Sequence, residues 1–303
     1  MNEKISNLSQ LAYVRRYMLA DGNEAGLKIV EVNNGKLRFL LNESKALDLP
    51  QLWHEGTNIS FVSKNGFTVR ELSFVRRFEG GMLYTCGLDS VGGRDGYELH
   101  GTLHNTPVRI TRCECGEERI IVQAEIRDSA LFGKNLVFRR TVTTGIGSDT
   151  VELNDELCNE GYRDEEYCLL YHVNLGYPML DEGCSLEADI LSATPRTPYA
   201  EHKKSEMKAI TAPIPNQEEM CYFLNLKKTQ ISLHNPKLGK TFTLSYSGDT
   251  LPHFVEWKSM ASGDYALGLE PCTTELDGGF AYKIIKANSK LSFSLQLQIR
   301  CHI

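Results

Sequence analysis

The sequence predicts an all-β protein, built as one large antiparallel β-sandwich with few short helices. Apolar and polar residues alternate with period two in many short segments, which is typical of half-buried strands. Turn residues separate these segments, and helical periodicity is scarce. Strands that follow one another without helices between them pair antiparallel and pack sheet against sheet.

The first third of the chain carries the weakest strand patterns. Residues 6–19 are compatible with one amphipathic helix, because Leu8, Leu11, Ala12 and Met18 would share one side. Residues 37–41 and 67–74 are weak strand predictions. We expect residues 1–60 to form a lead segment packed on the sandwich, within a single domain that spans residues 1–303.

The middle of the chain predicts three consecutive strands, at residues 119–126, 136–142 and 151–157. Cys113 and Cys115 precede them, and we interpret that stretch as a loop with free thiols because zinc ligands are usually separated by two to four residues. A short helix is possible at residues 215–220.

The last third contains the clearest strands. Turn residues 235–239 lie between two alternating runs and predict a hairpin. Near the C-terminus, the apolar residues Leu291, Phe293, Leu295, Leu297 and Ile299 alternate with polar ones. This pattern predicts a strand with one solvent-exposed face.

Composition excludes several classes of function. The net charge of −6 and the lack of long Lys/Arg blocks argue against nucleic-acid binding. No apolar run approaches the roughly 20 residues of a membrane span, and the first residues do not resemble a signal peptide. Nine scattered cysteines do not suggest a disulfide framework, so we expect a cytoplasmic protein.

Three stretches combine glycine with clustered polar side chains: residues 92–105, 170–178 and 267–279. In the second, an apolar run ends in His172 and Asn174 before Gly176, so we expect these side chains at the rim of a sheet. From the residues alone, His172 is either an active-site group or a buried structural histidine. Glu270 follows an apolar strand end, where a carboxylate must be paired or have a function.

His100 and His104 raise the possibility of a metal site. Four extended residues span about 13 Å, too far for two ligands of one ion with bonds near 2 Å. A tight turn at Gly101 would bring them closer, so this alternative stays open, with a hydrogen-bonded turn histidine as the simpler interpretation of His100. Phosphate-binding loops and the Gly-x-Ser-x-Gly elbow do not occur, which leaves imidazole and carboxylate groups suited to proton transfer.

These segments resemble the galactose mutarotases, or aldose 1-epimerases. The resemblance rests on residues 171–176, with a histidine followed by asparagine and leucine, on the histidine–glycine pair at 99–101, and on the glutamate-bearing strand at 267–271. The chain is most similar to an aldose 1-epimerase-like branch, with which it shares residues 85–88, 100–101, 172–178 and 180–183.

The resemblance implies a β-supersandwich and an epimerase that interconverts the α and β anomers of an aldose. Glu270 would be the general base on the anomeric hydroxyl, His172 the general acid on the ring oxygen, and His100 a hydrogen-bond partner of the sugar. It implies no metal and no organic cofactor. The remaining substrate-binding candidates are Asn174, His104, Arg77, Asp181 and Trp257.

Some family features are missing. The early Asn-Arg pair has no clear match, and Arg77 is its nearest candidate; the substrate-binding aspartate has none, although Asp181 lies close in sequence to His172. Trp257 is either a stacking platform for a sugar or a core aromatic residue.

Two other functions remain open. One is a non-catalytic carbohydrate-binding protein, and the other is a sugar isomerase or lyase on the same fold, with a metal at His100 and His104 as one version. In each case we expect a small-molecule sugar as the partner, no nucleic acid, no membrane, and a monomer or homodimer.

Overall fold

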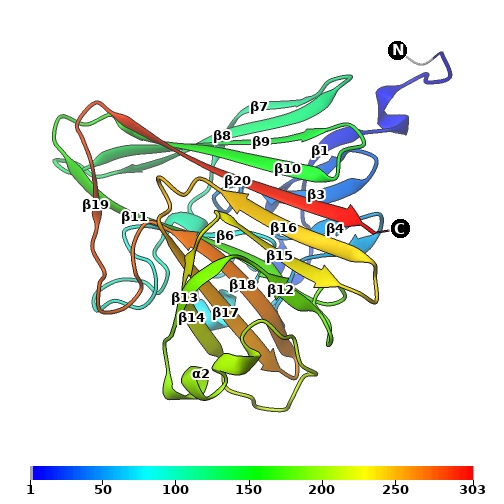
Figure 1. Ribbon diagram of the computed structural model, residues 1–303. Coiled ribbons are helices and arrows are strands. Elements are labelled where there is room, and N and C mark those ends of the chain that lie inside the picture. The colour runs from blue at the N-terminus through cyan, green and yellow to red at the C-terminus, as the bar shows by residue number, and fades with distance from the viewer. Residues whose placement is uncertain (1–2, 303) are drawn as a thin grey trace.

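The computed structural model describes residues 3–302, and these form three antiparallel sheets (Figure 1). The first is a five-stranded sheet near the N-terminus, in the order β1-β2-β3-β4-β5. Its strands are β1 (Tyr13–Met18), β2 (Lys28–Asn33), β3 (Leu37–Asn42), β4 (Leu52–His54) and β5 (Thr57–Asn58).

The second sheet has eight strands, in the order β12-β15-β16-β20-β10-β9-β8-β7. They are β7 (Arg109–Cys115), β8 (Arg119–Ser129), β9 (Asn135–Gly145), β10 (Thr150–Asn159), β12 (Ser185–Glu187), β15 (Gln230–Asn235), β16 (Lys240–Tyr246) and β20 (Lys290–Cys301).

The third sheet has seven strands, in the order β13-β14-β17-β18-β11-β19, and β6 also pairs with β11. The members are β6 (Tyr84–Leu88), β11 (Glu165–Leu175), β13 (Ile190–Pro195), β14 (Met220–Leu226), β17 (His253–Ala261), β18 (Asp264–Cys272) and β19 (Lys283–Ile285).

The helices among the described residues are short. They are α1 (Phe74–Arg77), α2 (Pro198–His202) and the 3-10 turns η1 (Leu8–Gln10), η2 (Gly22–Glu24), η3 (Leu103–Asn105) and η4 (Lys204–Glu206). Local sequence explains α2: Pro198 occupies its first turn, and the Thr197 side chain accepts a hydrogen bond from the Ala200 backbone N–H.

The all-β fold class is therefore confirmed, and most strand predictions match. The hairpin is β15–β16, the alternating C-terminal run is β20, and the three central strands are β8, β9 and β10. One hydrophobic cluster contains inward-facing residues of all three sheets, such as Phe39, Phe138 and Leu269. The sheets thus share one core, and the lead segment contributes a sheet of its own.

Four local predictions were wrong. Residues 6–19 form η1 and then β1, because Tyr13–Met18 pairs with β2. Residues 67–74 form a loop that leads into α1, and residues 215–219 contain a turn instead of a helix. Cys113 and Cys115 lie on edge strand β7, although both thiols are free as expected.

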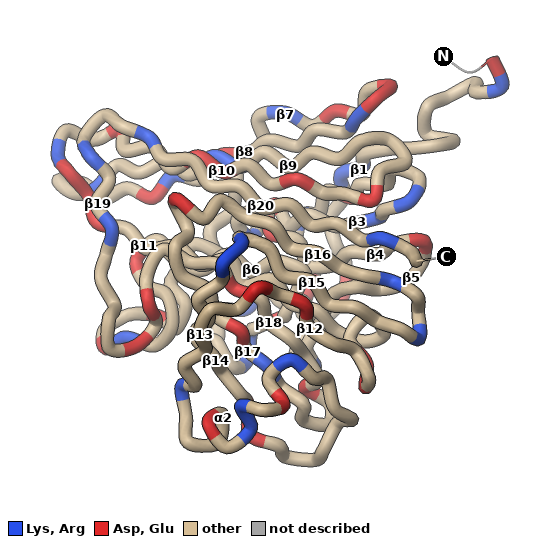
Figure 2. Tube along the Cα trace, in the orientation of Figure 1, with Lys and Arg blue, Asp and Glu red and all other residues tan. Residues whose placement is uncertain are grey.

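Lys and Arg residues alternate with Asp and Glu residues along the chain trace, without a long block of either charge (Figure 2). No helix among residues 3–302 is both long enough and apolar enough to cross a membrane.

Candidate active site

His172 and Glu270 lie opposite each other on neighbouring strands. β11 and β18 are antiparallel with Val173 paired to Leu269, so His172, one residue before Val173, lies opposite Glu270, one residue after Leu269. His172 Nε2 lies 3.2 Å from Glu270 Oε1. His172 lies three residues before the end of β11, and β6 pairs with β11 on the side opposite β18, so the side chain projects from the face of the sheet.

The alternation of strand residues separates the core from the site. Tyr171, Val173 and Leu269 point into the shared core, whereas His172 and Glu270 point to the opposite face of the seven-stranded sheet. Both polar side chains are nevertheless buried, because residues outside the sheet cover this face.

These two side chains line a cavity of about 600 Å³, a volume typical of small-molecule sites. Aromatic side chains from three parts of the chain form its walls: Phe61, Phe74, Phe78 and Trp257. Charged side chains also line it: Lys64, Asp264, Arg196 and Glu219. Lys64 pairs with Asp264 at 2.7 Å, and the Trp257 indole N–H donates to Glu219 at 2.7 Å.

His100 enters the cavity from a turn. It has a positive φ of 64°, and the Gly92 backbone N–H donates to its Nδ1 over 3.3 Å. Because Nδ1 is an acceptor here, the neutral ring carries its proton on Nε2. Burial, aided by the Arg196 charge, lowers the pKa of His100 to about 4, so the ring is a neutral donor at pH 7.

Burial also sets the protonation of the central pair. It raises the pKa of Glu270 well above its usual value, and the nearby Glu219 charge adds to this while Arg196 opposes it. Burial and the neighbouring His100 lower the pKa of His172 to about 3. Burial therefore favours the uncharged form of the pair, with the proton on Glu270.

Two atoms of this pair have no hydrogen-bond partner among the described residues: Glu270 Oε1 and His172 Nδ1. The 3.2 Å contact between Glu270 and His172 thus lacks the alignment of a good hydrogen bond. Buried polar groups are normally paired, so unpaired ones beside a cavity suggest a polar ligand.

The structure brings together four of the eight residues predicted from sequence, namely His100, His172, Glu270 and Trp257. Asn174 is fully buried beside them, and its amide donates to the carbonyls of Gly81 and His172. It therefore holds the backbone of β11 without lining the cavity.

The other three predicted residues do not line the cavity. His104 Nδ1 lies 2.6 Å from Asp48, and its ring stacks on Tyr84. Arg77 donates to Glu98 and lines a separate hollow. Asp181 pairs with Lys237.

The geometry gives no support to a shared metal at His100 and His104. In the described part of the chain, the one group of side chains with metal-ligand spacing is His54, Glu55 and Cys301. The Lys240 ammonium lies among them, 2.8 Å from His54 Nδ1 and 3.3 Å from Cys301 Sγ. A cation of the chain itself thus occupies that position.

Sequence reasoning missed Arg196, Glu219, Phe74 and Phe78. One signal was available: Ser192, Thr194 and Arg196 alternate with Leu191, Ala193 and Pro195, which is a strand pattern with one polar face. The two phenylalanines gave no such signal: Phe74 ended a predicted strand over residues 67–74, and Phe78 lay outside any predicted element.

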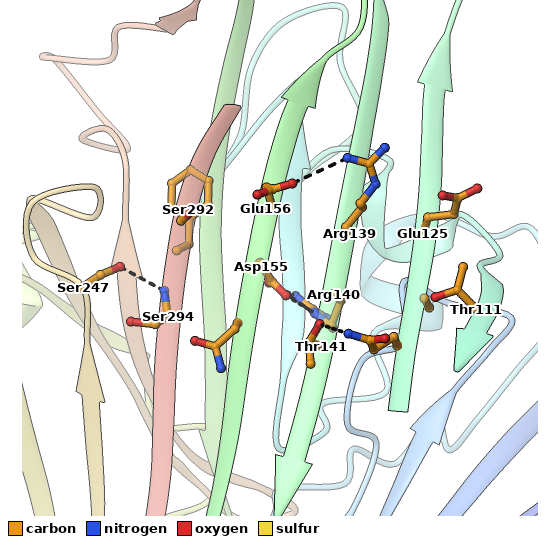
Figure 3. A pocket seen from close by; sticks show the side chains of 14 residues that line it. Thr111, Glu125, Arg139, Arg140, Thr141, Asp155, Glu156, Ser247, Ser292 and Ser294 are labelled. Atoms are coloured by element: carbon orange, nitrogen blue, oxygen red, sulfur yellow. Dashed lines mark hydrogen bonds and ion pairs between the residues drawn. The ribbon is translucent and has the colours of Figure 1, made fainter. Parts of the chain in front are cut away.

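A larger hollow, of about 680 Å³, lies on the eight-stranded sheet over β8, β9, β10 and β20 (Figure 3). Its charged side chains are paired, as Arg139 and Glu156 show. None of the residues predicted from sequence lines it. The cavity with His172 and Glu270 is therefore the better candidate for an active site.

The fold is shared with solved proteins of the galactose mutarotase-like type. A "putative aldose 1-epimerase" from Klebsiella pneumoniae superposes with a TM-score of 0.85 at 21% identity, over 97% of this chain and 86% of that one. A galactose mutarotase-like protein from Clostridium acetobutylicum gives a TM-score of 0.74 at 12% identity, over 97% and 100%.

The chain belongs to the family described as "Domain of unknown function (DUF4432)", whose model matches residues 24–282. Comparison with the curated proteins gives no match. At the identities of the two solved structures, the likeness shows the fold alone.

Proposed function

We propose that the protein is a sugar epimerase that interconverts the α and β anomers of an aldose by acid–base ring opening and closure. The observation that carries this proposal is the His172–Glu270 pair, an imidazole and a carboxyl group 3.2 Å apart that both line an aromatic-walled cavity. Sugars suit such a cavity because aromatic rings pack on their apolar faces while polar groups bind their hydroxyls.

The reaction needs one base and one acid. The base removes the proton of the anomeric hydroxyl, the acid protonates the ring oxygen, and the bond between C1 and that oxygen breaks. Rotation about the C1–C2 bond and closure with reversed roles give the other anomer. The site ends each cycle with the proton count it started with, so a pair that shares one proton is sufficient.

The roles inferred from the resemblance require the proton on His172 and a charged Glu270. Burial instead favours the proton on Glu270, because it disfavours the charged form of both groups. Transfer across the 3.2 Å contact interconverts the two forms without any change in net charge. Glu270 then acts as the base and His172 as the acid, while His100 Nε2–H donates to a sugar oxygen.

Anomer exchange followed by NMR across a panel of aldoses tests the proposal. We expect Glu270→Gln to lower the exchange rate at least 100-fold, since general acid–base groups contribute about 10²–10⁴. Glu256→Gln is the matched control, because Glu256 is an equally buried glutamate on β17 that does not line the cavity. Sugar binding without accelerated exchange, or equal rates for wild type and Glu270→Gln, would overturn it.

A further inference from the structure

A second hollow, of about 350 Å³, lies next to the catalytic cavity on the same face of the seven-stranded sheet. The two share the side chain of Val255 on β17. Strand alternation explains why they are neighbours. Arg196 and Thr194 are two residues apart on one face, as are Trp257 and Val255.

The pairing between strands extends this arrangement into rows. Thr194 pairs with Phe223 and Phe223 with Val255, next to Glu270 on β18. One row further from the cavity, Ser192 pairs with Asn225. Same-face residues on one strand are about 7 Å apart, which is the scale of the step between linked sugar rings.

The lining of the second hollow has the chemistry of a sugar subsite. Ser192, Thr194 and Asn225 are exposed and offer hydroxyl and amide groups. Phe223 supplies a half-buried aromatic ring, and His253 lies 4.0 Å from Glu275. Hydroxyl and amide groups beside an aromatic ring, with one carboxylate at Glu275, fit a ligand rich in hydroxyls.

The segment after β18 separates the two hollows. Leu276 lines the catalytic cavity, whereas Thr274 and Glu275 line the second hollow. The next residue, Asp277, holds Arg196 through two contacts of 2.5 and 3.1 Å. Both side chains of this ion pair are at least one third exposed, so the segment that separates the two hollows lies on their solvent side.

We propose that the substrate is a reducing disaccharide, or a longer oligosaccharide with the same reducing end. Its reducing ring occupies the catalytic cavity and the adjacent ring occupies the hollow lined by Thr194, Phe223 and Asn225. This inference rests on the proposed function, because only a sugar with a free anomeric hydroxyl undergoes the reaction.

The test compares kcat/KM for anomer exchange of monosaccharides and of reducing disaccharides of varied linkage, followed by NMR on the full chain. For wild type we expect at least one disaccharide to exceed its own reducing-end monosaccharide about tenfold, mainly through a lower KM. Thr194→Trp and, separately, Asn225→Trp fill the hollow from exposed positions and should bring this ratio close to one. Leu191→Trp, an exposed control on the same strand, should keep the wild-type ratio.

The outcomes separate the two proposals. Accelerated exchange of monosaccharides with no preference for any disaccharide would overturn the second subsite and leave the epimerase intact. The same would follow if both tryptophan variants, folded by circular dichroism, kept the wild-type ratio. Failure to accelerate exchange of any sugar would instead overturn the epimerase itself.

Discussion

Gly268 leaves the space in which the Glu270 carboxyl and the His172 ring meet. A Cβ atom at this position would lie 2.6 Å from Glu270 Oε1, 3.0 Å from His172 Cε1 and 3.2 Å from the Trp257 ring. The position follows from register, because Gly268 pairs with Asn174 on one side and Trp257 on the other. A side chain there would force the central pair apart.

We therefore expect Gly268→Ala to reduce anomer exchange at least tenfold while the protein remains folded. The obstructing atoms belong to side chains that can rotate, so the cost falls on their alignment and much less on the backbone. Exchange rates and urea unfolding would be measured together. Gly116→Ala, in the turn between β7 and β8 with its nearest contact at 3.4 Å, is the control. Full activity in Gly268→Ala would show that the geometry of the pair is not required.

The two cavity histidines predict a pH dependence of stability. Burial lowers the pKa of His100 to about 4 and of His172 to about 3, from 6.5 in the unfolded chain. The folded state therefore favours the neutral rings. The stability that depends on neutral rings is fully present above pH 6.5. It is lost as the pH falls from 6.5 toward 4 for His100 and toward 3 for His172.

Each histidine should contribute a slope of about 1.4 kcal/mol per pH unit within this window. Urea unfolding of wild type and His100→Gln between pH 7.5 and 4.5 measures the difference, in which other titrating groups cancel. We expect the loss of stability on acidification to be smaller in His100→Gln. Parallel curves for the two proteins would contradict the burial of a neutral His100.

For individual residues of the site, the sequence indicated which chemical groups are present but not the environment of each group. His172 and Glu270 were recognisable because polar residues interrupt apolar runs. Their protonation was not, because it depends on burial and on Glu219 and Arg196, which are distant in sequence. Distances along the chain likewise could not show that His104 contacts Asp48 instead of the cavity.

Strand elements were predicted best where both the pattern and the turns were clear. β20 and the hairpin β15–β16 have strict alternation and defined turn residues. β1 was mistaken for a helix, because a short segment with four apolar residues fits either period and only its pairing with β2 decides. Residues 67–73 form a loop in which Val69 and Leu72 line a separate hollow, whereas Phe74 of α1 lines the cavity, so local alternation there was misleading.

A single buried asparagine joins the five-stranded sheet to the eight-stranded one. Asn34 Nδ2 donates to Thr144 Oγ1 at 2.6 Å and to the carbonyls of Gly145 and Ser148, while its Oδ1 accepts from the backbone N–H groups of Lys36 and Leu37. The amide thus connects the β2–β3 turn to the β9–β10 turn.

We expect Asn34→Ala to destabilise the protein by about 2–4 kcal/mol, because it leaves buried donors and acceptors unpaired. Asn33→Ala is the control. The Asn33 side chain, on the preceding residue, accepts one exposed hydrogen bond from the Gly35 backbone N–H, so its loss should cost less than about 1 kcal/mol. Denaturant unfolding of both variants gives the comparison. Equal, small effects would mean that the connection between the two sheets does not depend on Asn34.

For the whole molecule, one buried ionic cluster connects the lead segment to both sheets of the sandwich. Arg140 on β9 donates to Asp155 on β10 at 2.7 Å and to Asp48 at 2.5 Å (Figure 3 shows the Asp155 side). Tyr171 on β11 donates to Asp155 at 2.8 Å, and Thr85 on β6 donates to Asp48. Composition and periodicity predicted the β-sandwich, but they contained no sign of this long-range cluster.

Because the cluster connects the β3–β4 loop to the other two sheets, we expect Arg140→Met to lower the free energy of unfolding by about 3–5 kcal/mol, the usual cost of removing one member of a buried ion pair. Arg139→Met is the neighbouring control. Its side chain is 43% exposed on the outer face beside Glu156, so the loss should stay below about 1 kcal/mol.

The same experiment tests the prediction of a single domain. The two tryptophans report on different sheets, Trp53 on β4 and Trp257 on β17. In single-tryptophan variants, Trp53→Phe and Trp257→Phe, the two fluorescence transitions should coincide in urea, and Arg140→Met should shift both equally. If the Trp53 transition moved alone, the lead segment would be a separate folding unit, and the buried cluster would not couple it to the sandwich.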